Sequence, residues 1–218
     1  MKKYIILIPI YNDRESLIKL IENINSEVKS LNSEISVIII NDASSQQIID
    51  KYQNTENINS IEIINMKENR GHARCIASGL KYIFEKKEFD YVIPMDGDGE
   101  DRPEEIQNFI ELAEQTDGKP IIGERVKRSE SSFFKSCYQF HKFLTLSFTG
   151  QSIKFGNFTC LSKTTIEKML KEKATWNSFS GSLKKIEKDL LTISSIRGTR
   201  YFGPSKMSFF NLLKHSLS

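Results

Sequence analysis

Short runs rich in isoleucine and valine alternate with stretches of helical periodicity through the first 125 residues. The apolar runs are continuous, a pattern typical of strands in a parallel sheet, because helices cover both faces of such a sheet. We predict strands at Tyr4–Ile8, Ile35–Ile40, Ser60–Asn65, Tyr91–Met95 and Pro120–Gly123. We predict helices at Arg14–Val28, Gln46–Tyr52, His72–Glu85 and Pro103–Glu114. The alternation predicts an α/β fold with an open, mostly parallel central sheet.

The pattern changes after Gly123. An amphipathic segment rich in phenylalanine covers Phe133–Phe148, and we interpret it as a helix that is either buried or lies in a membrane interface. The last segment, Ser208–Leu217, places Phe209, Leu212, Leu213 and Leu217 on one helical face. Between these two segments we predict a strand near Phe158–Leu161, helices near Thr164–Lys171 and Ser180–Lys188, and a strand near Leu191–Ile196. We interpret residues 1–218 as a single domain.

Charge is distributed unevenly along the chain. Residues 1–118 contain 13 Lys and Arg against 22 Asp and Glu, whereas residues 119–218 contain 18 against 6. The basic second half suits phosphates, an acidic membrane surface or nucleic acid, and the alternative is a solvated lysine-rich surface. No uncharged stretch reaches the roughly 18 residues that span a bilayer, so no transmembrane helix is predicted. Three cysteines without paired spacing indicate a reducing compartment and no zinc site.

The strand predicted at Tyr91–Met95 is followed by four carboxylates within six residues, namely Asp96, Asp98, Glu100 and Asp101. Concentrated negative charge at a strand end is costly unless a cation neutralises it, and carboxylate oxygens suit Mg²⁺ or Mn²⁺. A divalent ion there could bridge a diphosphate and stabilise it as a leaving group. The alternative is an acidic turn before a helix. The spacing does not fit a calcium-binding EF-hand.

Other polar residues also follow the predicted parallel strands, where ligands bind in open α/β sheets. Asp42 ends the second strand, and its carboxylate can accept a hydrogen bond from a base or ribose. Arg70 lies near a helix start, where it can approach a phosphate. Taken singly, such a residue is more often a helix cap or part of a turn, and the joint placement of the two favours a ligand site. We interpret His72 and His141 as structural residues.

Together these positions form an ordered series of motifs. They are Pro9-Ile10-Tyr11-Asn12, Asn41-Asp42-Ala43-Ser44, Asn69-Arg70-Gly71-His72-Ala73, and Met95-Asp96-Gly97-Asp98 continuing to Pro103-Glu104-Glu105. Later in the chain come Gly156-Asn157-Phe158 and the run from Arg200 to Lys206. With these motifs the chain resembles the family-2 glycosyltransferases of GT-A fold, a Rossmann-like α/β fold. It is most similar to polyprenyl-phosphate glycosyltransferases of the dolichol-phosphate mannosyltransferase type.

The resemblance implies an inverting, metal-dependent transferase of cell-envelope glycan synthesis, which moves a sugar from a UDP or GDP donor to a polyprenyl phosphate. Residues 1–125 would bind the nucleotide sugar, and residues 126–218 would face the acceptor and the membrane. The implied donor-binding residues are Pro9, Tyr11, Asn12, Asp42, Arg70, Gly71 and Asp96. The implied catalytic residues are Asp96, Asp98, Arg125 and Arg128, with Mg²⁺ or Mn²⁺ held by Asp98 and Glu100. The implied acceptor-phosphate residues are Asn157, Arg200, Ser205 and Lys206.

One position departs from the pattern, because related enzymes commonly have Gly-Asp-Phe where this chain has Gly156-Asn157-Phe158. Asn157 cannot act as a general base, but a phosphate acceptor is already anionic near neutral pH and needs little deprotonation. The departure therefore favours a phosphate acceptor or reduced activity. The alternatives are a transferase acting on a glycan or other hydroxyl, and a degenerate protein that binds nucleotide sugar without turnover.

The resemblance also implies peripheral association with the cytoplasmic face of the membrane. We expect no nucleic-acid partner, because the acidic cluster at Asp96–Asp101 would repel phosphates unless a metal were bound. Phe133–Phe148, the apolar face of Ser208–Leu217 and the basic half would form the interfacial surface. The alternative is that both segments pack into the core of the domain. Similar proteins often continue into hydrophobic helices where this chain ends at Ser218. We therefore expect a catalytic portion whose anchor is absent or supplied by a partner.

Overall fold

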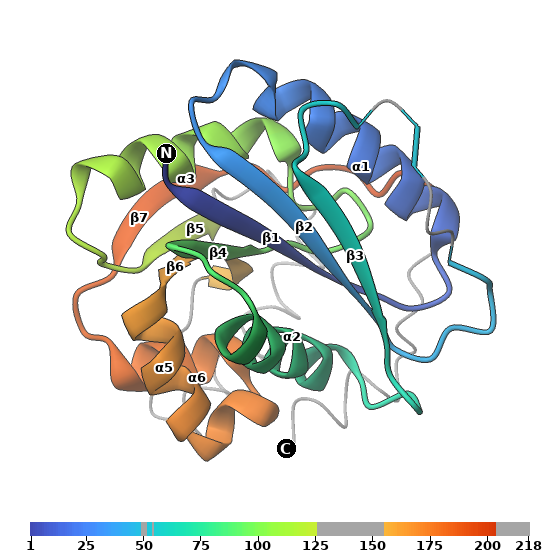
Figure 1. The fold of residues 1–218 in the computed structure, drawn as a ribbon. Coiled ribbons are helices and arrows are strands. Elements are labelled where there is room, and N and C mark those ends of the chain that lie inside the picture. The colour runs from blue at the N-terminus through green and yellow to red at the C-terminus, as the bar shows by residue number, and fades with distance from the viewer. Residues whose placement is uncertain (49–51, 54, 126–154, 204–218) are drawn as a thin grey trace, which may run out of the picture.

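A seven-stranded mixed sheet forms the centre of the computed structural model, which describes residues 1–48, 52–53, 55–125 and 155–203 (Figure 1). The strand order is β3-β2-β1-β4-β6-β5-β7. Strand β6 runs antiparallel to both of its neighbours, whereas the other neighbouring pairs are parallel. The strands are β1 (Lys3–Ile10), β2 (Glu34–Asn41), β3 (Ser60–Asn65), β4 (Tyr91–Pro94), β5 (Ile121–Arg125), β6 (Phe155–Ser162) and β7 (Leu191–Ser195). The predicted α/β fold with a mostly parallel sheet is confirmed.

Helices cover both faces of the sheet, which explains the continuous apolar runs (Figure 1). Alternate residues of β1 point to opposite faces, so Ile6 packs with α1 and α3 while Leu7 packs with α2, α5 and α6. The helices are α1 (Arg14–Glu27), α2 (His72–Lys86), α3 (Ile106–Gln115), α5 (Lys163–Lys171) and α6 (Phe179–Ile186). Short 3₁₀ turns are η1 (Val28–Ser30), η2 (Pro103–Glu105) and η3 (Lys173–Trp176).

The helix predicted at Gln46–Tyr52 is wrong for the residues of that range that the structure describes, 46–48 and 52. Side chains, not helical carbonyls, take the backbone N–H groups at its start. Asn12 Oδ1 accepts from the N–H of Ser45 at 2.8 Å and of Gln46 at 3.3 Å. The connection from β2 to β3 therefore starts as an irregular loop beside Asn12.

Two predicted segments, Phe133–Phe148 and Ser208–Leu217, lie outside the described residues. Within the described part of the chain, no helix is long and apolar enough to cross a membrane. Cys75 and Cys160 are free and buried. The predicted helix at Pro103–Glu114 is divided, because Pro103–Glu105 forms a 3₁₀ turn before α3 begins.

The register of the parallel strands brings the motif residues to one edge of the sheet. Ile10 pairs with Asn41, and Asn41 pairs with Asn65, so β1, β2 and β3 end side by side. The N–H of Met95, just after β4, donates to the carbonyl of Leu7 at 2.9 Å. The residues that follow β4 are thereby delivered to the same edge, where ligands bind in open α/β sheets.

Candidate active site

The loop Asp96–Asp101 turns sharply after β4 and is held by its own carboxylates. The N–H of Asp96 donates to Asp101 Oδ2 at 2.9 Å, and the N–H of Glu100 donates to Asp98 Oδ1 at 3.0 Å. Gly99 has a φ of 89°, a conformation that favours glycine. A Cβ at Gly99 would also lie 2.5 Å from the ring of Tyr201. The four carboxylates predicted from the sequence are therefore gathered in one compact turn.

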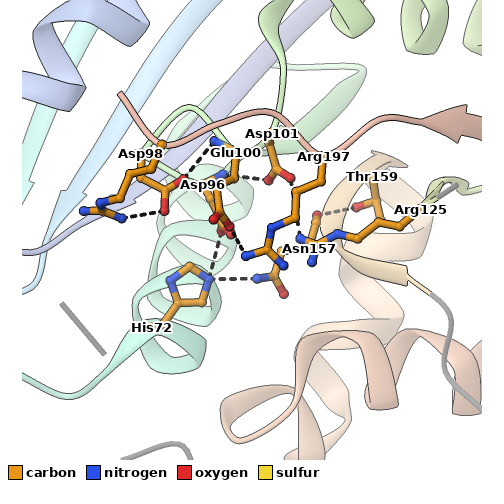
Figure 2. Close-up of polar contacts among 10 residues, drawn as sticks. His72, Asp96, Asp98, Glu100, Asp101, Arg125, Asn157, Thr159 and Arg197 are labelled. Atoms are coloured by element: carbon orange, nitrogen blue, oxygen red, sulfur yellow. Dashed lines mark hydrogen bonds and ion pairs between the residues drawn. The ribbon is translucent and has the colours of Figure 1, made fainter. Parts of the chain in front are cut away.

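Asp96 lies at the centre of this site, where elements far apart in the sequence meet (Figure 2). Its Oδ1 is 3.1 Å from Nε2 of His72, the first residue of α2. Nδ2 of Asn157, from β6, is 2.7 Å from the same His72 nitrogen. Burial favours the neutral acid, but His72, Arg125 and Asn157 together lower the pKa of Asp96 to about 2. Asp96 is therefore an ionised hydrogen-bond acceptor.

The pKa of Asp101 is shifted in the opposite direction to that of Asp96. It is 4% exposed, and burial together with the charge of Asp96 raises its pKa to about 8. Arg125 Nη2, 3.8 Å from Asp101 Oδ1, is too distant to reverse this effect. Two neighbouring carboxyl groups thus have different protonation states near neutral pH. Only one of them adds negative charge to the site.

Residues 196–203, which we call the strap, pack across the acidic turn. Backbone N–H groups of Gly198 and Tyr201 donate to the carbonyls of Glu100 at 2.8 Å and Asp98 at 2.9 Å. A Cβ at Gly198 would lie 2.5 Å from the carbonyl oxygen of Gly99, so only glycine fits there. The close contact of the two backbones therefore fixes the strap against the turn.

The strap also brings two arginines to the carboxylates. Arg200 Nη1 lies 2.7 Å from Asp98 Oδ2, and its other terminal nitrogen pairs with Asp13. Arg197 pairs with Glu100. These are charge-assisted hydrogen bonds, the strongest class in proteins. Arg200, predicted to contact acceptor phosphate, thus lies against a carboxylate predicted to hold the metal.

Asp98 and Glu100 fit a hard divalent cation by their chemistry, since both offer carboxylate oxygens. Burial raises the pKa of Asp98 above its ordinary value, so a nearby cation would favour its ionised form. Among the described residues, however, no group of three or more His, Cys, Asp or Glu side chains is arranged to hold a metal ion. A metal here would therefore take few ligands from these protein residues and the rest from the donor or water.

The nucleotide-side residues are joined by hydrogen bonds at the ends of β1 and β2. Asp42 is buried and accepts from the N–H of Arg70 at 2.7 Å and of Gly71 at 2.8 Å. The N–H of Asn12 donates to Ser44 Oγ at 2.9 Å. Asp42 therefore holds the loop before α2, and a contact with a base remains a prediction that uses its remaining lone pairs.

The remaining residues predicted to line the site differ in their exposure and in their partners. Pro9 is buried in β1, whereas Tyr11 is 42% exposed at the end of that strand and presents an aromatic ring to solvent. Arg70 pairs with Glu68. Arg125 lies against Gly156, where a Cβ would be 3.3 Å from its Nη2. Arg128, Ser205 and Lys206 lie outside the described residues.

Sequence reasoning missed the contacts made by His72, Asp13 and Arg197. His72 follows Gly71 directly at the edge of the sheet, and this position is the signal that could have identified it. Asp13 and Arg197 carry no such signal, because their contacts depend on how the strap returns to the acidic turn.

Comparison with known proteins gives concordant results. The model of glycosyl transferase family 2 matches residues 5–179. Over 229 residues the chain is 31% identical to an undecaprenyl-phosphate 4-deoxy-4-formamido-L-arabinose transferase from Photorhabdus laumondii, covering 98% of this chain. The chain spans 65% of the length of that relative.

Two solved structures share the fold. A mannosyltransferase from Pyrobaculum calidifontis, in complex with GDP-Man and Mn²⁺, superposes with a TM-score of 0.63 at 15% identity, covering 92% of this chain and 58% of that one. S. aureus TarS 1-349 in complex with UDP-GlcNAc superposes with a TM-score of 0.61 at 14% identity, covering 93% of this chain and 60% of that one. The GT-A fold expected from the motifs is confirmed.

The raised pKa of Asp101 predicts how stability depends on pH. From about pH 4 to pH 8 the folded protein keeps a proton on Asp101 that the unfolded chain loses. The free energy of unfolding should therefore fall as pH rises through this range. Asp101→Asn mimics the protonated acid and should flatten that fall, as measured by urea unfolding at pH 5.5, 7 and 9. The exposed Glu104→Gln serves as the control, and an Asp101→Asn slope equal to wild type would contradict the assignment.

Proposed function

The chain belongs to glycosyltransferase family 2, and on that premise we propose that it transfers a sugar from a nucleoside diphosphate to a polyprenyl phosphate. One observation carries the proposal: the acidic turn after β4 meets residues from the second half of the chain. Asn157 and Arg200 both reach this turn, through His72 and Asp98 respectively. Residues predicted to bind the acceptor therefore lie beside residues predicted to bind the sugar donor, and a transfer reaction requires the two substrates to be adjacent.

On the donor side, Asp98 and Glu100 would hold Mg²⁺ or Mn²⁺ at the diphosphate. The bound ion would neutralise the charge that develops on the departing diphosphate. The two structural neighbours, in complex with GDP-Man and Mn²⁺ and with UDP-GlcNAc, support a nucleotide-sugar donor. Asp96, ionised and half-buried, would accept hydrogen bonds from hydroxyls of the ribose or the sugar.

On the acceptor side, an oxygen of the polyprenyl phosphate would attack the anomeric carbon as the bond to the donor diphosphate breaks. The configuration at that carbon inverts, and a nucleoside diphosphate leaves. Asn157 supplies no base, which suits an acceptor that is already an anion. The name of the curated relative, an undecaprenyl-phosphate sugar transferase, supports this acceptor class.

Arg200 would change partners during the reaction. Its guanidinium is shared between Asp98 and Asp13, and a divalent ion on Asp98 would compete with it. A released guanidinium can bind phosphate oxygens in a bidentate manner. Ser205 and Lys206, which follow the strap, would add to this phosphate site.

We further propose that the protein works at the cytoplasmic membrane surface. Two large apolar side chains of the strap, Ile196 and Phe202, are 49% and 46% exposed beside the proposed acceptor site. Such side chains can enter the interface of a bilayer. The segments Phe133–Phe148 and Ser208–Leu217 are assigned to the same surface as part of this proposal.

The direct test is transfer of labelled sugar into an organic-extractable lipid. The full chain is incubated with undecaprenyl phosphate in detergent, Mn²⁺, and labelled UDP or GDP sugars in turn. The proposal predicts labelled lipid with at least one donor and none without the lipid phosphate. Label in a soluble glycan instead would indicate a hydroxyl acceptor, and donor binding without any turnover would indicate a degenerate binder.

Asp98→Ala should abolish turnover and the metal-dependent part of donor binding. The variant loses a carboxylate that would hold the cation at the diphosphate, and charge stabilisation by such a cation is worth on the order of several kcal/mol. Initial rates and calorimetric donor titration with and without Mn²⁺ measure both effects. Glu104→Gln, an exposed change close to the same turn, should behave like wild type. If Asp98→Ala keeps more than about a tenth of the wild-type rate, equivalent to about 1.4 kcal/mol, the metal assignment is wrong.

Arg200→Gln should raise the acceptor Michaelis constant about tenfold, or about 1.4 kcal/mol, with donor affinity nearly unchanged. The physical reason is the loss of one bidentate phosphate contact. Arg102→Gln removes a partly exposed arginine that pairs with Glu104 and serves as the matched control. An equal loss of donor affinity in Arg200→Gln would instead place Arg200 on the nucleotide diphosphate.

A further inference from the structure

His72 is the one residue at the centre of the site that sequence reasoning assigned to structure alone. Its Nε2 has two partners: Asp96 Oδ1 at 3.1 Å and Asn157 Nδ2 at 2.7 Å. The three side chains come from α2, from the turn after β4 and from β6 (Figure 2). A single ring atom therefore joins a proposed donor-binding carboxylate to a proposed acceptor-side amide.

The two contacts require different states of that nitrogen. When Nε2 carries a proton, it donates to the Asp96 carboxylate. When Nε2 has a lone pair, it accepts from the amide of Asn157. The proton on Nε2, which depends on both the protonation state and the tautomer of His72, thus selects which neighbour the ring holds.

The surroundings favour the protonated ring. Asp96, Asp98 and Asp101 face it from the turn after β4, Arg125 lies near Asp96 on β5, and Asn157 faces it from β6. Burial is the largest single influence and lowers the pKa of His72, but the contact with Asp96 and the carboxyl groups of Asp101 and Asp98 together raise the pKa above its ordinary value. Arg125 affects Asp96 through its charge, whereas His72 contacts the carboxylate at hydrogen-bond distance.

We propose that His72 is a positioning residue for the transfer reaction: it orients the Asp96 carboxylate toward the donor and fixes its distance from Asn157. This inference rests on the proposed function. Asp96 directs Oδ1 toward His72, and its second oxygen would accept a hydrogen bond from a hydroxyl of the sugar donor. Without a hydrogen-bonding group at position 72, Asp96 would lose its His72 contact and keep only the smaller influences of Arg125 and Asn157.

Asn157 and His72 form a matched pair under this proposal. An Asp at position 157 would place a second carboxylate at the same ring nitrogen and would compete with Asp96 for its proton. Asn157→Asp should therefore raise the pKa of His72 further and weaken the orientation of Asp96. Its kcat should fall below the wild-type value instead of rising.

The kinetic test compares His72→Gln with His72→Leu in the lipid-transfer assay. Gln can donate a hydrogen bond to Asp96 and Leu cannot, so His72→Leu should lose about 10–100-fold, mainly in kcat, while His72→Gln keeps most activity. Wild-type kcat should fall as pH rises through the raised pKa of His72, and His72→Gln should remove that fall. Lys81→Gln, an exposed change on the same helix, is the control. Wild-type kcat in His72→Leu, or equal losses in both variants, would overturn the proposal.

A second test needs no turnover, and so separates this inference from the proposed function. The His72 ring is titrated by NMR in the full chain and assigned by its absence in His72→Gln. Its pKa should lie above 6.5 in the wild type and fall in Asp96→Asn. An identical pKa in the two proteins would overturn the contact. If no donor gives turnover in the wild type while the NMR shift is present, the proposed function fails and the His72–Asp96 contact stands.

Discussion

The acidic turn after β4 must be neutralised by cations drawn from the rest of the chain. Four carboxylates in six residues lie at the end of a buried strand, where burial disfavours their charged forms. His72 comes from α2, Arg125 from β5, and Arg197 and Arg200 from the strap. Asp101 contributes by keeping its proton, since its pKa is raised to about 8. The local concentration of charge thus brings together segments that are about 100 residues apart in sequence.

The cationic side chains that neutralise the acidic turn could also bind substrate. The cations that neutralise the turn are of the kinds that bind phosphate, so the same groups can serve either the carboxylates or a substrate. A metal ion and a nucleoside diphosphate would arrive as a nearly neutral unit. Exchange of partners by Arg197 and Arg200 would then cost less than exposing unpaired charges. The pairs of Arg197 with Glu100 and of Arg200 with Asp98 are present in the structure, and under the proposed function they would exchange partners when substrate binds.

Much of the fold could be predicted because local patterns decide it. Continuous Ile and Val runs predicted the parallel strands, and the carboxyl ends of those strands predicted that Asp42, Arg70 and Asp96 lie at the same edge of the sheet. The helix at Gln46–Tyr52 was wrong for its described residues, where the backbone instead forms a loop bonded to the side chain of Asn12, a residue distant in the sequence. The antiparallel direction of β6 depends on a connection that no short motif encodes. The pairs of Arg200 with Asp13 and of His72 with Asp96 were missed for a similar reason, since tertiary contacts determine them.

The central claim is that the carboxylates after β4 form a cation-dependent site for a nucleoside diphosphate. A thermal-shift measurement of the full chain with UDP or GDP, in the presence of Mn²⁺ or of a chelator, tests it most directly. A ligand that binds the folded state raises the melting temperature by mass action. One nucleotide together with Mn²⁺ should raise the melting temperature more than either component alone. No increase with either nucleotide, or the same increase with the chelator, would contradict it.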